Sequence, residues 1–221
     1  MNGSAFSTRG QPANNSPGAA PDSREIKMVI DNYRAHFAAA EARTRGYGLD
    51  VPAVRLDPRL LLTTEMREKL PILMKDALGR LSIHDLVFQR LSLHHGLRAS
   101  LAGLLQSDVY LTLGWVKLLD EGGEDARLFE FDEEWIEHSL ARGGMESEAT
   151  ELHAWLTLPS MEIIDLSLLS SVAIINRTPT RMGAVLIHRA DDTTRGICYV
   201  PMLIGDDFLK RIGMVGERAL H

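Results

Sequence analysis

The chain has 221 residues and a mass of 24.5 kDa, which is enough for one domain with a sizeable core. Apolar residues make up 45% of it and charged residues 24%, the balance of an ordinary globular protein rather than a disordered or fibrous one. The formal charge of −6 argues against nucleic acid or an anionic membrane as the main partner, and the single cysteine excludes an intrachain disulfide.

The sequence favours the cytoplasm. A single cysteine fits a reducing compartment, and no apolar run reaches the roughly 18 residues that a membrane span needs. The first residues lack the apolar core of a Sec signal peptide. We therefore expect a cytoplasmic protein without membrane contact, with export as an effector left open.

The N-terminal half reads as helices. Residues 1–23 are rich in Gly, Ser, Asn and Pro and predict a disordered arm, which leaves 24–221 as a single domain. The stretch "SREIKMVIDNYRAHFAAAEARTRG" has an apolar stripe at helical spacing and ends at Gly46 and Gly48. Two further helices are predicted over 66–81, broken or kinked at Pro71, and over 82–106.

The pattern then changes to strands. "DVYLTLGWVKLL" has the β-branched and aromatic residues of a strand, and a hairpin is expected within "HAWLTLPSMEIIDLS". Between them, about 120–150 is an acidic insertion, which we interpret as a solvated loop around a short helix at 132–141. "GAVLIHRA" and "GICYVPMLI" are two more strands, and "GDDFLKRIGMV" is a last helix capped by Asp206 or Asp207. Helices followed by a mostly antiparallel sheet predict an α+β fold.

The hairpin carries His153 and Asp165 near its two ends. A histidine that acts as a base needs a partner that fixes its tautomer, and a carboxylate on the neighbouring strand serves if both side chains leave the same face. A three-residue loop from Pro159 to Met161 pairs Trp155 with Asp165 and sets His153 diagonal to it. A four-residue loop sends the two side chains apart, so the spacing permits the pair without requiring it.

The stretches "GLRASLAGLLQSDVYLTLGWV" and "HAWLTLPSMEIIDL" resemble the core of transglutaminase-like members of the papain-fold cysteine enzymes. In that family a helix begins with the nucleophilic cysteine, and the base and its orienting carboxylate follow on strands. The resemblance covers residues 90–167 and implies a papain-like core with His153 as the base and Asp165 as its orienter. We also expect Trp155, Trp115 and Ser100 to contribute to substrate binding.

The same alignment places Gly96 where the family has its cysteine. A helix N-terminus lowers the pKa of a thiol and its N–H groups can hold an oxyanion, which is the physical reason for that position. Glycine carries no nucleophile. Ser100 lies one helical turn further on, and Cys198 would serve only in a permuted order. A metal site in which His94 and His95 join His153 and Asp165 is a third alternative, which is disfavoured because adjacent helical residues point about 100° apart.

These observations predict a degenerate, non-catalytic binding module that uses the former active-site cleft to hold a peptide or protein side chain. We expect no cofactor, metal or nucleic acid. One rival is an active acyl-transfer enzyme, a peptidase, amidase or transglutaminase-like protein, that uses another nucleophile or whose cysteine was replaced by mutation. The other is an accessory or structural interaction protein in which the hairpin is ordinary scaffold. The oligomeric state is not predicted.

Overall fold

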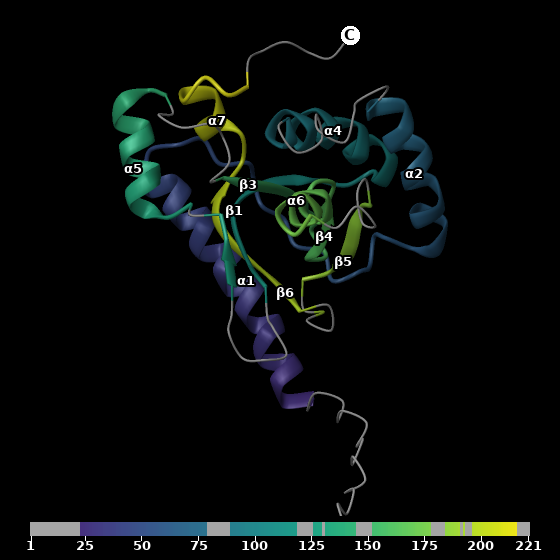
Figure 1. Ribbon diagram of the computed structural model, residues 1–221. Coiled ribbons are helices and arrows are strands. Elements are labelled where there is room, and N and C mark those ends of the chain that lie inside the picture. Colours follow the sequence, from purple (N-terminus) through teal and green to yellow (C-terminus); the bar gives the residue numbers. More distant parts are fainter. Residues whose placement is uncertain are drawn as a thin grey trace, which may run out of the picture.

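The computed structural model describes residues 23–78, 89–118, 126–129, 131–144, 152–177, 184–190, 192 and 196–215 (Figure 1). The helices are α1 (Ser23–Gly46), α2 (Thr64–Leu78), α4 (Arg90–Leu105), α5 (Glu133–Arg142), α6 (Leu168–Ile175) and α7 (Asp207–Arg211). The strands are β1 (Tyr110–Leu118), β2 (Ala126–Leu128), β3 (His153–Thr157), β4 (Glu162–Asp165), β5 (Leu186–Arg189) and β6 (Ile197–Ile204). The α+β prediction is confirmed. The predicted arm, up to residue 22, and the start of the predicted 82–106 helix lie outside the described residues.

The six strands form one antiparallel sheet in the order β2-β1-β3-β4-β5, with β6 also paired to β1. On one side β1 pairs with β6, and on the other its first half pairs with β3 and its second half with β2. The register with β6 shifts between Leu113 and Gly114, which marks a bulge in the middle of the sheet.

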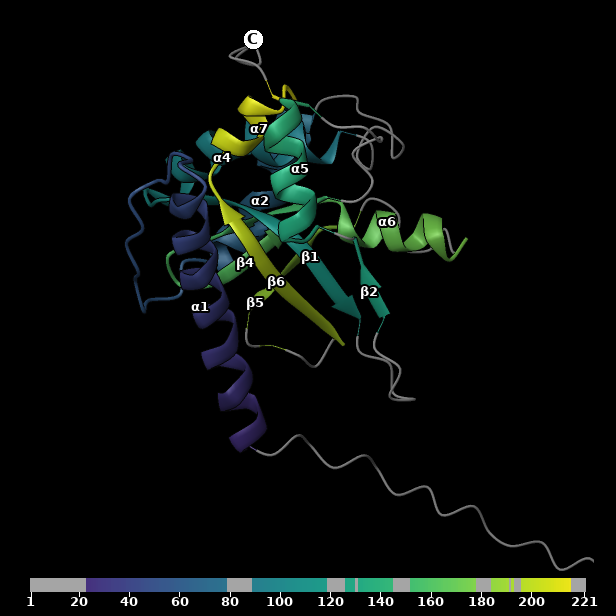
Figure 2. The ribbon, with the colours of Figure 1, turned by 90° about the vertical axis from the view of Figure 1, so that its left-hand side faces the viewer.

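Side chains alternate between the two faces of the sheet, so each face has its own core. On one face Leu97 and Leu101 of α4 belong to a cluster with Leu156 of β3, and α2 lies beside α4 (Figure 1). On the other face Phe37 of α1 belongs to a cluster with Trp155 of β3. Helix α1 runs alongside β6 (Figure 2).

The hairpin folds as the three-residue loop predicts. Leu156 lies opposite Ile164 and Thr157 opposite Ile163, so the next pair outward is Trp155 and Asp165. The Leu158 N–H donates to the Glu162 carbonyl oxygen at 2.9 Å, which closes the loop over Pro159 to Met161. His153 and Asp165 therefore leave the same face of the sheet.

Two other expectations need correction. Helix α2 continues through Pro71 instead of breaking there. The short helix expected at 132–141 is present as α5, but the acidic stretch is not simply a solvated loop around it, because β2 pairs with β1 and α5 packs by Ile136. Phe131, just before α5, is also fully buried. Charged residues dominate the composition of this stretch, but the apolar Phe131 and Ile136 pack α5 against the core.

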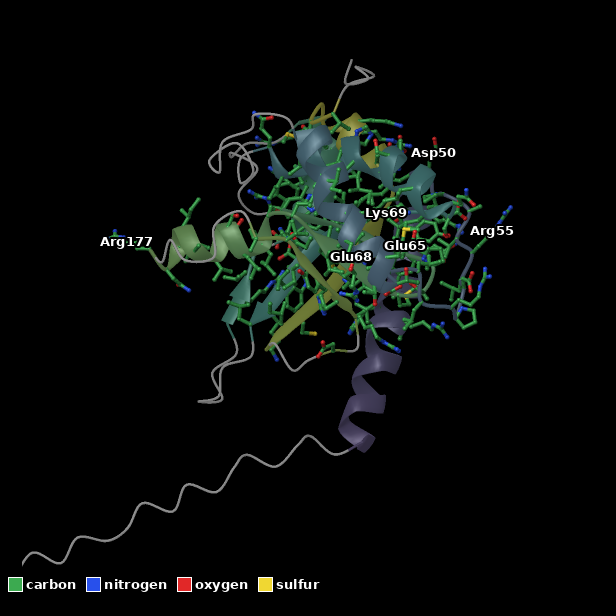
Figure 3. The ribbon with its side chains drawn as sticks, turned by 90° about the vertical axis from the view of Figure 1, so that its right-hand side faces the viewer. Asp50, Arg55, Glu65, Glu68, Lys69 and Arg177 are labelled. Atoms are coloured by element: carbon green, nitrogen blue, oxygen red, sulfur yellow. The ribbon has the colours of Figure 1, made fainter. Side chains whose placement is uncertain are left out.

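Helix α6 was not predicted. It buries polar residues and exposes apolar ones, the reverse of what is usual for a helix of a globular protein. Its buried residues include Ser170 and Ser171, whereas Ile174 and Ile175 are exposed. It projects from the body of the protein towards Arg177 (Figure 3). None of the helices within the described ranges is long and apolar enough to cross a bilayer.

Candidate functional site

His153 and Asp165 meet in the core. The His153 Nε2 atom lies 2.6 Å from Asp165 Oδ2, and both side chains are fully buried. His153 lies opposite Gly114 on β1, and a side-chain carbon at Gly114 would overlap the Val200 carbonyl and the Trp155 ring. Position 114 therefore requires glycine because the neighbouring strand and the indole approach so closely.

Asp165 is the centre of the buried network. Its Oδ2 atom also accepts from the Tyr199 hydroxyl at 2.7 Å, and its Oδ1 atom accepts from the Ser167 and Leu168 N–H groups at 2.9 and 3.0 Å. Burial alone would raise the pKa of this carboxyl, but the attraction of His153 and the hydrogen bonds outweigh it, and the pKa falls well below 3.8. Asp165 is therefore ionised at neutral pH and holds the first turn of α6.

His94 of α4 reaches the same carboxylate from another direction. Its Nδ1–H donates to the Arg90 carbonyl oxygen at 2.6 Å, and its Nε2 accepts from the Leu166 N–H at 3.1 Å while lying 3.7 Å from Asp165 Oδ1. Burial lowers the pKa of His94 from 6.5 to about 4, although the charge of Asp165 opposes this. His94 is therefore neutral at pH 7, and its two hydrogen bonds connect α4 to the residue that follows β4.

Arg90 and Phe129 complete the site. Arg90 is buried, donates from Nε to the Leu152 carbonyl oxygen at 2.9 Å, and places its guanidinium 5.3 Å from the centre of the Phe129 ring. The Phe129 ring stacks on His153 at 4.6 Å between centroids and 7° between planes. Burial lowers the pKa of Arg90 to about 10, partly offset by Asp165, so the side chain stays cationic at neutral pH.

The hydrogen bond to Asp165 leaves Nδ1 as the basic atom of His153. In the described part of the chain Nδ1 is buried and has no hydrogen-bond partner, so no hydroxyl or thiol there is poised to give it a proton. Phe129 covers a face of the ring. The arrangement can orient and polarise an imidazole, but none of the residues that the structure describes brings a nucleophile to it.

No family model matches the chain, and comparisons with curated proteins and with solved structures likewise give no match. An assignment of the site therefore rests on its own geometry.

Gly96 is not brought to the pair as expected. Helix α4 begins at Arg90, so Gly96 is its seventh residue and does not stand at the helix N-terminus. It follows His94 by two residues, or about 200° around the helix, and is partly exposed. A cysteine side chain there would leave α4 away from Asp165. Ser100, one turn later, is exposed.

The other sequence candidates occupy three different environments. Trp155 is fully buried, and its Nε1–H donates to the Tyr33 hydroxyl at 2.9 Å, so it is a core residue rather than the wall of a cleft. Trp115 is partly exposed beneath the Arg127 guanidinium, 4.4 Å from the ring centre. Cys198 precedes Tyr199 on β6 and therefore points to the opposite face of the sheet.

The two adjacent histidines diverge. His94 contacts the buried network, whereas His95 Nε2 lies 2.9 Å from Asp206 Oδ2 between α4 and α7. Asp206 begins α7 without a side-chain capping bond. Among the described residues no group of three or more His, Cys, Asp or Glu side chains is placed to hold a metal ion.

A pocket of about 510 Å³ opens at the far end of α4 from Arg90. Its lining is polar and comprises Arg55, Leu56, Asp57, Gln106, Ser107, Asp108 and Pro159. It shares no residue with the His153–Asp165 network.

The helix pattern indicates buried roles for Arg90, which was not predicted, and for His94, which was considered only as a metal ligand. Arg90 and His94 are four residues apart, so they share the face of α4 that Leu97 and Leu101 also occupy. Two polar side chains on an otherwise apolar face indicate a buried polar partner. Phe129 left no such signal, because nothing in its local pattern points to His153.

Proposed function

We propose that the chain is a non-catalytic binding protein with the order of elements of the transglutaminase-like papain fold, and that it receives a peptide or protein side chain beside His153. One observation carries the proposal: the His153–Asp165 pair is intact at 2.6 Å, while Nδ1 of His153 meets no nucleophile among the described residues. The succession of α4, β1, β3 and β4 supports the family, since it follows the order that the resemblance implies.

The pair has a use without catalysis. Asp165 joins β4 to β3 through His153, to β6 through Tyr199 and to the start of α6 through backbone N–H groups. Such a network fixes the imidazole ring in one orientation, so a partner side chain that takes the place of Phe129 would meet a rigid, polarised ring.

Turnover assays test the absence of catalysis. Wild type, His153→Ala and His188→Ala are incubated with a p-nitrophenyl ester and, separately, with a glutamine-containing protein and a fluorescent amine. His188 is another buried histidine, so its variant controls for the loss of a core imidazole. We expect all three to release product at the rate of buffer alone. Turnover by wild type and His188→Ala that disappears in His153→Ala would show that the protein is an enzyme.

Two further variants address the nucleophile. Gly96→Cys should create no activity, because the new thiol would point away from Asp165. Cys198→Ala and treatment with iodoacetamide should leave both assays unchanged. A gain of turnover in Gly96→Cys would show that helix α4 presents position 96 to His153 and that the proposed geometry is incorrect.

A further inference from the structure

Phe129 adopts a backbone conformation that bulky residues avoid. Its φ angle is 69°, in the left-handed region that favours glycine, and it follows the three-residue edge strand β2. An outlier of this kind persists only where the surroundings hold it, and such outliers gather at functional sites. The side chain is only partly buried, whereas His153 and Arg90, which it contacts, are buried.

The contacts of Phe129 suit the electrostatics of an aromatic ring. The face of such a ring carries partial negative charge, so it attracts cations and polarised N–H groups. Arg90 places a guanidinium over the ring at 5.3 Å, and the His153 imidazole stacks face to face on it, with its Nε2–H directed away towards Asp165. Trp155 stacks in turn on His153 at 5.8 Å. We call the space held by Phe129 against His153 and Arg90 the aromatic slot.

We propose that the aromatic slot is the binding site for an electron-rich aromatic ring of a partner, and that Phe129 is its intramolecular occupant. This deepens the proposed function and rests on it, since it names the side chain that binds beside His153. The partial exposure of Phe129 supports exchange at this point, since this ring reaches solvent whereas His153 and Arg90 beneath it are buried.

Alternative ligands fit less well. An anion would compete for Arg90 with the charge of Asp165, which already acts on that guanidinium. An aliphatic side chain would fill the volume but would forgo the attraction to Arg90 and His153. Because cation–π attraction is strongest for indole, we expect the order Trp and Tyr before Phe.

The first experiment opens the slot in the full chain with Phe129→Ala. The probes are toluene, p-cresol and 3-methylindole, with methylcyclohexane as a saturated ring of similar size, and affinity is measured by calorimetry. We expect the variant to bind the aromatic probes about three- to thirty-fold tighter than methylcyclohexane. Wild type should bind them at least about tenfold more weakly than the variant, because Phe129 competes at high effective concentration.

Phe131→Ala is the matched control. Phe131 is fully buried two residues away, and its ring neighbours are Trp135 and Phe208. Its cavity should take toluene and methylcyclohexane alike. Should Phe129→Ala fail to fold, Phe129→Leu keeps most of the bulk and removes the attraction to the Arg90 guanidinium. That variant should bind 3-methylindole several-fold tighter than wild type does.

The outcomes separate the two proposals. Equal affinity of Phe129→Ala for toluene and methylcyclohexane, or affinity no higher than that of wild type, would overturn the slot and leave the non-catalytic assignment standing. N-acetyltryptophanamide binding like 3-methylindole indicates a polypeptide side chain as the natural ligand, and its exclusion indicates a free aromatic molecule. A preference for aromatic probes that persists in Phe129→Ala combined with His153→Ala would overturn the role of His153.

Discussion

Protonation of His94 should make the protein lose stability in mildly acidic solution, well before its carboxylates titrate. The unfolded chain takes up a proton on this histidine near pH 6.5, whereas the folded protein does so only near pH 4, because the ring is buried. The contribution is therefore complete above pH 6.5 and is lost as the pH falls between these values. Asp165, whose pKa is lowered from 3.8, loses its contribution only below that window.

The magnitude follows from the two pKa values. Between pH 7.5 and 5 the linkage relation gives a loss of about 2 kcal/mol in the free energy of unfolding. With a urea dependence of about 2 kcal/mol per molar, that loss lowers the unfolding midpoint by about 1 M.

The assay is urea unfolding of wild type and His94→Gln across this pH range. Glutamine does not titrate, and its side-chain oxygen can accept the Leu166 N–H, so the variant should be less stable at pH 7.5 but should lose less on acidification. His138→Gln, the same substitution at an exposed position on α5, is the matched control. If wild type and His94→Gln decline in parallel, the buried neutral state of His94 is refuted.

Three further predictions concern the core and use the same unfolding assay. Gly114→Ala should lower the free energy of unfolding by at least about 2 kcal/mol, because the new carbon has no space. Gly103→Ala, where nothing lies within 4 Å, should raise it by up to about 1 kcal/mol, and equal effects at the two glycines would contradict the close approach at β1. Asp165→Asn should cost about 3–5 kcal/mol by breaking a buried pair, whereas Asp206→Asn, in a partly exposed network, should cost about 1 kcal/mol or less. A larger cost at Asp206 would show that Asp165 is not the centre of the buried network. Trp155→Phe should cost about 1 kcal/mol through loss of the indole hydrogen bond to α1, and a neutral result would show that this bond does not hold the helix.

The His153–Asp165 pair was predictable because it depends only on residues close together in the sequence. Strand alternation and a three-residue loop are enough to place His153 beside Asp165, and the structure has both. The start of α4 was not predictable in the same way, because the apolar periodicity continues through residues on both sides of Arg90. The resemblance therefore gave position 96 a terminal role that the helix does not allow.

The rest of the site depends on contacts between distant segments. Phe129 lies 24 residues before His153, in the part of the acidic stretch that precedes the predicted 132–141 helix and was interpreted as a solvated loop. Its stacking follows from the pairing of β2 with β1, and a three-residue strand is too short to be recognised from alternation. Composition alone therefore predicted a charged stretch and did not identify Phe129, Phe131 and Ile136, which pack against the rest of the protein.

The position of β6 affects how the protein is made. This strand pairs along most of β1 and carries Ile204, whose N–H donates to Thr44 on α1, 160 residues earlier. During synthesis on the ribosome, α1 and one edge of β1 therefore cannot pack against β6 until almost the whole chain has emerged. In that interval the apolar side of α1 and an unpaired strand edge are open to aggregation, so we expect the nascent chain to depend on chaperones until β6 has docked.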